Sequence, residues 1–386
     1  MHPNIVKHPE LAEAGAQRIA WVKQNMPILG IIGQRFEKEK PFRGKRVLVC
    51  VHLEAKTSYL ALLFAQGGAE VVVTGSNPDS TKDDVVAALD QAGLHVYAAH
   101  GASHDDMQQY MSYALDLNPN IVIDDGGDVV ELLHGERQDV AQHIVGVCEE
   151  TTTGVLRARA RAKAGQLEFP VVLINDAHCK YLFDNYHGTG QSVWDAIMRS
   201  TNLSVCGKTV VILGFGWCGQ GCADRARGLG ANVIVCETDP IKAVAAHLHG
   251  YRVMPSLEAS LEADFFVTAT GSKHVLNAGH FSSMKNGAVI ANAGHFHLEL
   301  DLASLKSLAI QHQQVRDNVT AYKLDDHRSV FLLGGGNIVN IACGDGHPAE
   351  IMDTSFALQA LSAEYLVSRG QNLSKGVHVV PQTIDQ

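Results

Sequence analysis

Glycines at a spacing suited to phosphate binding occur in the middle of this 386-residue sequence. Residues Thr209–Leu213 are mostly β-branched and predict a buried strand, and Gly214, Gly216 and Gly219 follow in a G-x-G-x-x-G pattern. The first glycine permits a tight turn, the second lets the backbone approach a pyrophosphate, and the third lets helix and strand pack closely. A helical pattern over residues 218–229 would then offer unpaired N–H groups to the phosphates.

An acidic residue follows this unit where a dinucleotide site needs one. Residues 232–236 predict a second strand that ends at Glu237, and Gly221 lies just beyond the fingerprint. A carboxylate accepts hydrogen bonds from both ribose hydroxyls and repels a 2′-phosphate, so NAD is favoured over NADP. A glycine-rich turn without a cofactor is the alternative, but strand, helix, strand and acid at this spacing favour the nucleotide site.

Polar side chains also follow predicted strands in the N-terminal half of the chain. The expected strands are residues 46–52, 70–74, 95–99, 121–124 and 171–175, with helices such as 57–66 and 82–91 between them. This alternation predicts a doubly wound parallel sheet, whose sites lie off the carboxyl ends of the strands. The polar residues at those ends are His52, 76–77, 124–128, 149–153 and 175–176. They are too numerous for a purely structural sheet, although helix caps are the alternative at 124–128 and 149–153.

The order of the elements predicts an α/β chain of two doubly wound, Rossmann-like domains with a cleft between them. Residues 1–45 are expected to form a surface helix and then a Pro- and Lys-rich connector. After a helix at 192–200 and the fingerprint, further strands are expected at 265–268, 288–292 and 331–333. The final helix, 351 to about 368, should return to the first domain, which gives two hinge crossings near 180–190 and 340–348. The assignment is a substrate domain of 1–182 and 344–370, an NAD domain of 183–343 and a C-terminal extension of 371–386.

The composition excludes several classes of protein. A net charge of −10 without a basic run argues against a nucleic-acid partner. No signal peptide or long apolar run is present, so we expect neither export nor a membrane span. The eight cysteines are scattered in the manner of free thiols, which predicts a reducing cytoplasm. Cys218 and Cys222 share a helix face without a second pair, so no metal site is expected.

Several motifs in order resemble the S-adenosyl-L-homocysteine hydrolase family along essentially the whole chain. They are Val51-His-Leu-Glu-Ala-Lys-Thr57, Gly75-Ser-Asn-Pro-Asp-Ser-Thr81, Asp124-Asp-Gly-Gly-Asp128, Glu149-Glu-Thr-Thr-Thr-Gly154, Phe183-Asp-Asn185, the glycine fingerprint, Asn292-Ala-Gly-His-Phe296 and Gly346-His-Pro348. The fingerprint sequence Gly214-Phe-Gly-Trp-Cys-Gly-Gln-Gly221 is most similar to that of the archaeal and thermophilic-bacterial branch, which includes S-inosyl-L-homocysteine hydrolases.

The resemblance implies a hydrolysis with no net redox change. Tightly held NAD oxidises the ribose 3′-hydroxyl, which acidifies the C4′ hydrogen; a base removes it, the 5′-thiolate leaves, water adds, and the ketone is reduced again. By resemblance, Asp125 is the C4′ base, Lys180 with a depressed pKa and Asp184 handle the 3′-hydroxyl, and Glu150 holds the ribose. His52 and His295 resemble the imidazoles near C5′. Any one of these residues alone would be weak evidence in a chain with 20 histidines.

The resemblance also implies two sets of binding residues and an assembly. The substrate set is Glu54, Lys56, Thr57, His347, Met352 and Phe356. The NAD set is Thr151, Thr152, Thr153, Asn185, Gly214, Gly216, Gly219, Gly221, Glu237, Lys242, Gly294 and Asn340. The family's tetramer or dimer of dimers leads us to expect a homo-oligomer, with a small nucleoside thioether as substrate.

One departure from the best-known branch concerns the purine base. That branch has His-x-Thr-x-Glu at the adenine edge, whereas this chain has His52, Glu54 and Lys56 at those spacings. Hypoxanthine has a donor at N1 and an acceptor at O6, so a carboxylate and an ammonium would match it, the reverse of adenine. The alternative is that Glu54 and Lys56 only pair with each other.

Two further departures leave alternatives open. Leu333-Gly-Gly-Gly-Asn-Ile-Val-Asn340 replaces a family Leu-Ala-Glu-Gly-Arg-Leu-Val-Asn, so Gly335 and Asn337 put the amino-acid end of the substrate in doubt. Relatives continue beyond the position of Gln386 with a tail that reaches a neighbour's NAD, so we expect weaker cofactor retention unless the sequence is cut there. The rival functions are an ordinary dehydrogenase that turns over free NAD, and a catalytically silent NAD-binding regulator.

Overall fold

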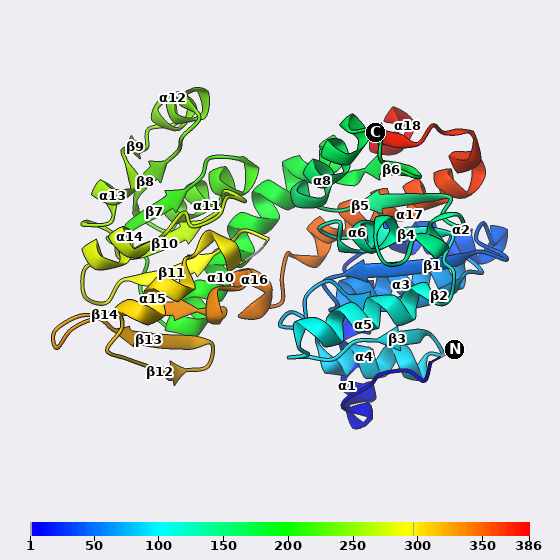
Figure 1. The fold of residues 1–386 in the computed structure, drawn as a ribbon, viewed down its shortest axis with the longest axis horizontal. Coiled ribbons are helices and arrows are strands. Elements are labelled where there is room, and N and C mark those ends of the chain that lie inside the picture. Colours follow the sequence, from blue (N-terminus) through cyan, green and yellow to red (C-terminus); the bar gives the residue numbers. More distant parts are fainter. Residues whose placement is uncertain (1, 296) are drawn as a thin grey trace. The chain divides into compact units, whose positions relative to one another are not determined.

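The computed structural model describes residues 2–295 and 297–386, and it divides the chain into two compact units (Figure 1). Unit 1 contains residues up to Tyr181 and again from Ala349 onwards, and unit 2 contains Leu182–Pro348. The chain therefore passes between the units twice, at 181–182 and at 348–349.

Unit 1 is built on a parallel sheet of seven strands in the order β15-β6-β5-β4-β1-β2-β3. Its strands are β1 (Arg46–Val51), β2 (Glu70–Gly75), β3 (His95–Tyr97), β4 (Ile121–Asp124), β5 (Gly146–Glu149), β6 (Pro170–Leu173) and β15 (Gly376–Val379). The order reverses at β1, which pairs with β2 on one side and β4 on the other, so the predicted doubly wound α/β class is confirmed. The sequence analysis missed β5 and β15, which have only four residues each.

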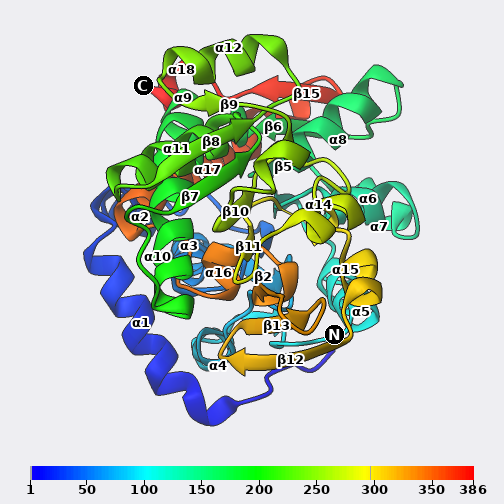
Figure 2. The ribbon, with the colours of Figure 1, turned by 90° about the vertical axis from the view of Figure 1, so that its left-hand side faces the viewer.

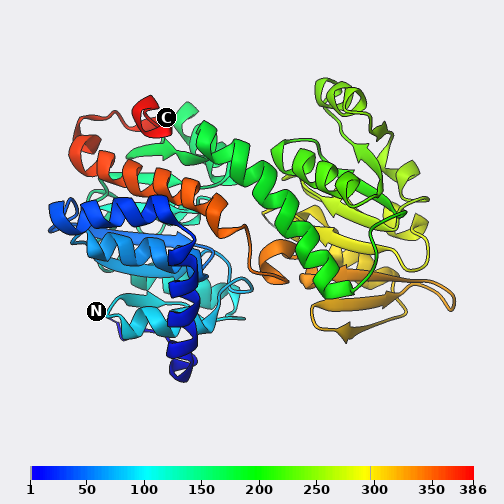
Figure 3. The ribbon, with the colours of Figure 1, turned by 180° about the vertical axis from the view of Figure 1, so that it is seen from behind.

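Helices cover both faces of this sheet because its strands are apolar on both sides. Val47 and Val49 of β1 pack into one buried cluster, and Leu48 and Cys50 pack into another on the opposite face. The helices are α1 (Ala12–Gln24), α2 (Pro27–Glu39), α3 (Ala55–Gln66), α4 (Asp83–Gln91), α5 (His104–Leu115), α6 (Asp128–His134), α7 (Gln138–Ala141), α8 (Thr152–Lys163), α9 (His178–Lys180), α17 (Ala349–Arg369) and α18 (Gln382–Asp385). Figure 3 shows the blue N-terminal helices and the orange-red α17 on one face.

One local prediction in this unit is wrong. The expected Pro- and Lys-rich connector is largely the helix α2, which begins at Pro27. Proline is favoured at the first position of a helix, because the N–H that it lacks has no partner there in any case. Pro27, which the sequence analysis took as part of a connector, is therefore the first residue of a second helix.

Unit 2 contains a sheet of eight strands in the order β12-β13-β14-β11-β10-β7-β8-β9. The strands are β7 (Thr209–Leu213), β8 (Asn232–Cys236), β9 (Arg252–Val253), β10 (Phe265–Thr268), β11 (Val289–Asn292), β12 (Gln311–Arg316), β13 (Val319–Lys323) and β14 (Ser329–Leu333). The neighbouring strands β9, β8, β7, β10, β11 and β14 are all parallel. The direction in which successive strands are added to the sheet reverses at β7, as in a dinucleotide-binding fold. The antiparallel hairpin of β12 and β13 at the edge (Figure 2) was not predicted, because β12 is exposed along its whole length and has no apolar alternation.

The helices of unit 2 include an uncommon π-helical turn where the chain enters the unit. This turn, η3 (Tyr181–Gly188), leads directly into α10 and contains Asp184 and Asn185. The helices are α10 (Thr189–Thr201), α11 (Trp217–Gly228), α12 (Pro240–Leu248), α13 (Ser256–Ala259), α14 (Ala278–Ser283), α15 (Leu302–Leu308) and α16 (Val339–Ala342). Turns of this kind are frequent at functional sites. Nowhere in residues 2–295 and 297–386 is there a helix with the length and apolar character needed to cross a bilayer.

Candidate active site

Two pairs of acids at the carboxyl ends of β4 and β5, Asp124-Asp125 and Glu149-Glu150, divide into two kinds. Asp124 and Glu149 are register partners on the adjacent strands and are both buried. Each stabilises a helix start: Asp124 Oδ2 accepts from the N–H of Val130 at 3.0 Å, and Glu149 Oε1 accepts from the N–H of Thr151 at 3.0 Å. The capping interpretation is therefore correct for the first acid of each pair, and the second acid remains for other chemistry.

Burial makes both capping acids weak acids. Burial raises the pKa of Asp124 to about 7, and the nearby carboxylates of Asp128 and Asp125 add to the rise. Burial and the charge of Asp124 raise the pKa of Glu149 well above its usual range. Gly154 makes room for this acid, since a Cβ there would lie 2.0 Å from Glu149 Cδ. The two acids also hold the backbone of the site, because Asp124 Oδ1 accepts from the N–H of Asp125 at 3.0 Å and Glu149 Oε1 accepts from the N–H of Gly126 at 3.0 Å.

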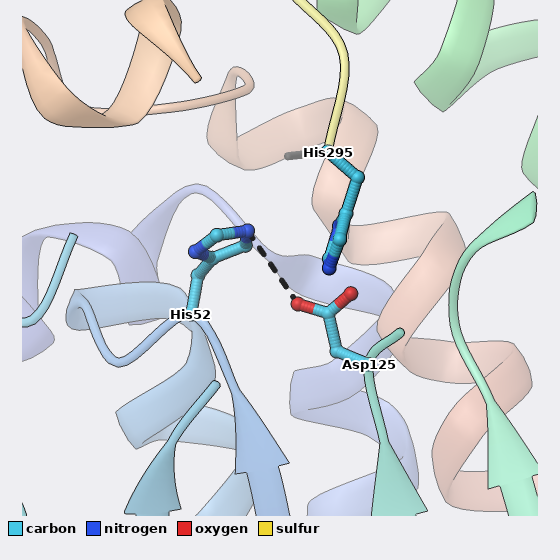
Figure 4. Close-up of side chains that lie close together, drawn as sticks. All are labelled: His52, Asp125 and His295. Carbon is cyan, nitrogen blue, oxygen red and sulfur yellow. Dashed lines mark ion pairs between the residues drawn. The ribbon is translucent and has the colours of Figure 1, made fainter. Parts of the chain in front are cut away.

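The second acid after β4 contacts a histidine after β1. Asp125 Oδ2 lies 3.5 Å from His52 Nε2 and accepts from the hydroxyl of Ser76 at 2.9 Å (Figure 4). The Ser80 hydroxyl donates to the carbonyl of Asn77 at 2.9 Å, so its oxygen accepts from His52 Nδ1–H at 2.6 Å. This bond leaves His52 Nε2 to exchange a proton on the side of Asp125. The two residues follow the strands where the order reverses, which is where sites form in such sheets.

A lysine, an acid and an amide meet beside this pair. Lys180 Nζ of α9 lies 3.5 Å from Glu150 Oε1, and Gln359 of α17 donates to Glu150 Oε2 at 2.5 Å. All three residues are at most 5% exposed. The sequence analysis missed Gln359; its only signal was a polar residue within an apolar stretch of the last helix. A buried lysine side chain beside a carboxylate that is itself held in place can take part in proton transfer.

The residues predicted to read the base form a buried ion pair. Lys56 Nζ lies 2.7 Å from Glu54 Oε2, and Glu54 also caps α3 by accepting from the N–H of Lys56 at 3.2 Å and of Thr57 at 3.3 Å. The Thr57 hydroxyl donates to the backbone carbonyl of His52 at 2.7 Å. An acceptor and a donor thus lie side by side at the carboxyl edge of the sheet. Two further predicted substrate residues, Met352 and Phe356 of α17, belong to the apolar core of unit 1.

In unit 2, the glycine fingerprint forms the expected turn between β7 and α11. Gly214 has a φ of +100°, and a Cβ on Gly219 would lie 2.0 Å from the Gly214 carbonyl oxygen, so both positions require glycine. A Cβ on Gly216 would meet no described atom within 4 Å. The space beside Gly216 is the feature that a pyrophosphate needs. Gly221 has a packing role instead, because a Cβ there would lie 1.9 Å from the Tyr186 carbonyl oxygen.

Glu237 at the end of β8 is held as a carboxylate. Its Oε2 accepts from the N–H of Phe215 in the fingerprint at 2.7 Å, and its Oε1 accepts from the N–H groups of Thr238 at 2.7 Å and Asp239 at 3.0 Å. Burial opposes ionisation, but the three backbone donors outweigh it and lower the pKa of Glu237. Predicted Lys242 lies on α12, with Nζ 3.9 Å from Asp239 Oδ2. The acid is thus placed and charged as ribose recognition requires.

Asp184 of η3 is paired with a histidine from the end of unit 2. His347 Nδ1 lies 2.7 Å from Asp184 Oδ1, and His347 Nε2 lies 3.3 Å from the Thr189 hydroxyl. Gly188 leaves room for the ring, since a Cβ there would lie 2.9 Å from Nδ1. The imidazole therefore holds the predicted 3′-hydroxyl acid from within the same unit.

An amide and an acid organise the loops at the carboxyl ends of β10 and β11, and a second amide lies on α16. Asn292 accepts from the N–H of Gly294 at 2.8 Å, and Glu299 accepts from the N–H of Gly271 at 2.8 Å, so both brace the backbone. Sequence reasoning missed Glu299, although it lies near the family motif. Asn340 donates to Ser192 at 3.0 Å, while its buried Oδ1 has no partner among the described residues. Such an orphaned acceptor, the open Gly216 and the charged acid after β8 fit a bound dinucleotide.

The remaining predicted residues lie on both units. In unit 1, Thr151 precedes α8 and donates its hydroxyl to Glu149 Oε1 at 3.1 Å, with Thr152 and Thr153 in the first turn of the helix. In unit 2, Asn185 is buried in η3 and His295 is half-buried in the loop after β11. Phe296, the last residue of that motif, lies outside the described residues. Each unit therefore carries its own group of predicted site residues.

A fingerprint domain joined to a second doubly wound domain with histidine, lysine and paired acids at its strand ends defines an NAD-binding α/β enzyme. Comparison with known proteins makes this specific. Residues 3–140 match the model of S-adenosyl-L-homocysteine hydrolase, and residues 185–346 match the model of its NAD binding domain.

Full-length relatives agree with these matches. An adenosylhomocysteinase of Pyrococcus abyssi is 52% identical over 99% of this chain and 90% of its own length. An S-inosyl-L-homocysteine hydrolase of Methanopyrus kandleri is 48% identical over 99% and 90%, and an adenosylhomocysteinase of Thermotoga maritima is 49% identical over 96% and 92%. The chain belongs to the S-adenosyl-L-homocysteine hydrolase family, and the predicted family and NAD-binding domain are confirmed.

Proposed function

We propose that the chain hydrolyses the thioether bond of an S-nucleosidyl-L-homocysteine to a nucleoside and homocysteine, with NAD as a catalytic cofactor. The observation that carries the proposal is the set of His52, Asp125, Glu150 and Lys180 at one edge of unit 1, in a chain whose other unit is an NAD-binding domain. An ordinary dehydrogenase needs no second set of acids and bases for elimination.

Each unit contributes separate parts of the chemistry. Bound NAD would accept a hydride from the ribose 3′-carbon and return it at the end; Gly214, Gly216, Glu237 and Asn340 are the residues proposed to hold it. Lys180, kept in place by Glu150, accepts the proton of the 3′-hydroxyl, and Asp184 with its His347 partner orients that hydroxyl.

Elimination and water addition are assigned to the acid and the imidazole at the order reversal of the sheet. Asp125 removes the C4′ proton once C3′ is a ketone, because the ketone stabilises the resulting carbanion. His52 Nε2 protonates the departing thiolate and then takes a proton from the entering water. The 3.5 Å between His52 Nε2 and Asp125 Oδ2 allows the pair to return protons to each other between the half-reactions.

For the base, we propose that Glu54 and Lys56 recognise hypoxanthine. Their acceptor and donor atoms are 2.7 Å apart and buried, a pattern that complements the adjacent N1–H and O6 of hypoxanthine. Adenine would place its N6–H group against the ammonium and its N1 against the carboxylate. The competing interpretation is that the two side chains satisfy each other and leave the base to other groups.

The experiment is a thiol-release assay on the purified protein with S-inosylhomocysteine and S-adenosylhomocysteine. We expect homocysteine from at least one substrate, a transient bound-NADH absorbance and no net NADH. Net NADH in proportion to substrate would identify a dehydrogenase, and NAD binding without thiol release would identify a silent relative. A higher kcat/KM for S-adenosylhomocysteine would contradict the hypoxanthine proposal alone.

We also propose a cytoplasmic homo-oligomer. The eight cysteines, all free in the structure, suit a reducing compartment. Ile241, Val244 and Leu248 of α12 are spaced to share a helix face and are 58–80% exposed, which suits cover by another subunit. Light scattering tests the assembly, and a monomer at micromolar concentration would contradict it.

A further inference from the structure

A carboxylate from the end of the chain caps the short helix that holds Lys180. Asp385 of α18 accepts from the N–H of His178 and from the N–H of Cys179, each at 2.8 Å and each through a different carboxylate oxygen. The Cys179 thiol donates to the Asp385 backbone carbonyl at 3.0 Å. Three contacts therefore join segments 206 or more residues apart.

The parallel sheet explains why the end of the chain arrives there. β15 pairs in parallel with β6, with Val379 opposite Leu173, so both strands end at the same edge of the sheet. The chain after β6 continues to α9, and the chain after β15 continues to α18. Val380 and Ile384 pack on the apolar core of unit 1 and fix the approach of Asp385.

Among the described residues, no neighbouring side chain caps the start of this helix, although Ala177 packs in the core of unit 1. α9 has three residues, and its N-cap residue, Ala177, has no side chain that can bond to the free N–H groups. Asp385 supplies that function from a distance, as an Asp at the N-cap would do locally. Lys180 follows directly, 4% exposed, with its Nζ 3.5 Å from Glu150 Oε1.

We propose that Asp385 is a positioning residue for the first oxidation, acting through α9 on Lys180. The proposal rests on the function proposed above, in which Lys180 accepts the 3′-hydroxyl proton. Without the carboxylate, two N–H groups lose their acceptors and α9 moves away from the sheet edge. A displacement of about 1 Å in a proton acceptor can reduce a rate up to about a hundredfold.

The experiment compares Asp385→Ala, Asp385→Asn and Asp385→Glu in the full chain loaded with NAD. We expect Asp385→Ala to lower the rate of bound-NADH formation and kcat about ten- to a hundredfold, with KM changed less than threefold. Asp385→Glu should restore part of kcat, because a carboxylate can still accept both N–H groups, and Asp385→Asn should lie between the two. Amide exchange of residues 178–180 should rise roughly fivefold in Asp385→Ala, the equivalent of a lost helix cap.

The matched control is Asp106→Ala, which removes the N-terminal cap pair with Ser103 from α5 in the same unit. It should leave bound-NADH formation and exchange at 178–180 unchanged. An unchanged kcat or unchanged exchange in Asp385→Ala overturns the proposal, as does an equal loss of kcat in the control. The exchange measurement does not depend on catalysis. If the unmodified protein made no bound NADH but Asp385→Ala still exchanged faster at residues 178–180, the proposed function would be refuted and the capping role of Asp385 would stand.

Discussion

Replacing Lys56 by alanine distinguishes the two interpretations of the base site. Lys56 Nζ is 2.7 Å from Glu54 Oε2, and the two side chains are 7% and 11% exposed, so solvent screens the pair weakly. If the ammonium donates to O6 of hypoxanthine, its loss leaves that oxygen without a donor in a buried site. If the two side chains only satisfy each other, both substrates are affected alike.

The size of the effect follows from the burial. An unsatisfied buried acceptor costs about 1–3 kcal/mol, which is a loss of affinity of about fivefold to about 150-fold. We therefore expect Lys56→Ala to lower kcat/KM for S-inosylhomocysteine by about fivefold to about 150-fold. The value for S-adenosylhomocysteine should not improve, because removing a donor creates no acceptor for the N6–H group. Glu54 keeps its two backbone donors, so α3 should remain capped.

The assay is thiol release with both substrates across their KM ranges. The double variant Glu54→Thr with Lys56→Glu should turn the preference towards adenine, and threonine at the cap position can still cap α3. Arg35→Ala is the control, since it removes the Arg35–Glu364 pair of α2 and α17 at 2.6 Å and should leave the substrate ratio unchanged. An equal fall for both substrates in Lys56→Ala would refute base recognition by this pair.

Three further results are expected. Lys180→Met should prevent bound-NADH formation, whereas Asp125→Asn should allow it but lose thiol release by at least about a hundredfold, because the two act at different steps. Glu237→Ala should weaken NAD at least about tenfold and NADP less, measured by calorimetry, because the carboxylate that repels a 2′-phosphate is gone. The pKa of Asp124 is raised from 3.8 to about 7, so the folded chain keeps a proton that the unfolded chain releases. The contribution of Asp124 to the free energy of unfolding in urea should therefore fall as pH rises from about 4 to about 7, by on the order of 4 kcal/mol, and the difference between the unmodified protein and Asp124→Asn should follow this slope.

Specific outcomes contradict each of these three. Loss of bound NADH in Asp125→Asn would remove its assignment as the C4′ base. Equal losses for NAD and NADP in Glu237→Ala would assign the acid to the fingerprint turn alone, and Glu237→Gln is the control that keeps its shape without its charge. If the free energy of unfolding had the same pH dependence between pH 4 and 7 in Asp124→Asn as in the unmodified protein, Asp124 would be ionised when folded.

Local sequence patterns predicted most of the helices and strands and the glycine-rich turn proposed to bind the cofactor. The unit from Thr209 to Glu237 is contiguous, and its glycines are required by backbone angles and close contacts within a few residues, such as the φ of +100° at Gly214. Most of the longer parallel strands were predictable for the same reason, because their apolar runs face helices on both sides, whereas the short β5 and β15 were missed. Edge strands with exposed polar residues, such as β12, have no such pattern.

The sequence by itself determined the family, the two doubly wound sheets and the set of residues available for chemistry. The strand-end pattern alone could not separate Asp124 from Asp125 or Glu149 from Glu150, because neighbours at a strand end differ only in the direction of their side chains; only the family resemblance distinguished them. Tertiary structure made that division through the pairing of β4 with β5. It also decided the partners that come from far along the chain, Gln359 for Glu150 and Asp385 for α9. Such contacts depend on which segments lie side by side once the sheet is assembled, and no periodicity or spacing within either segment encodes them.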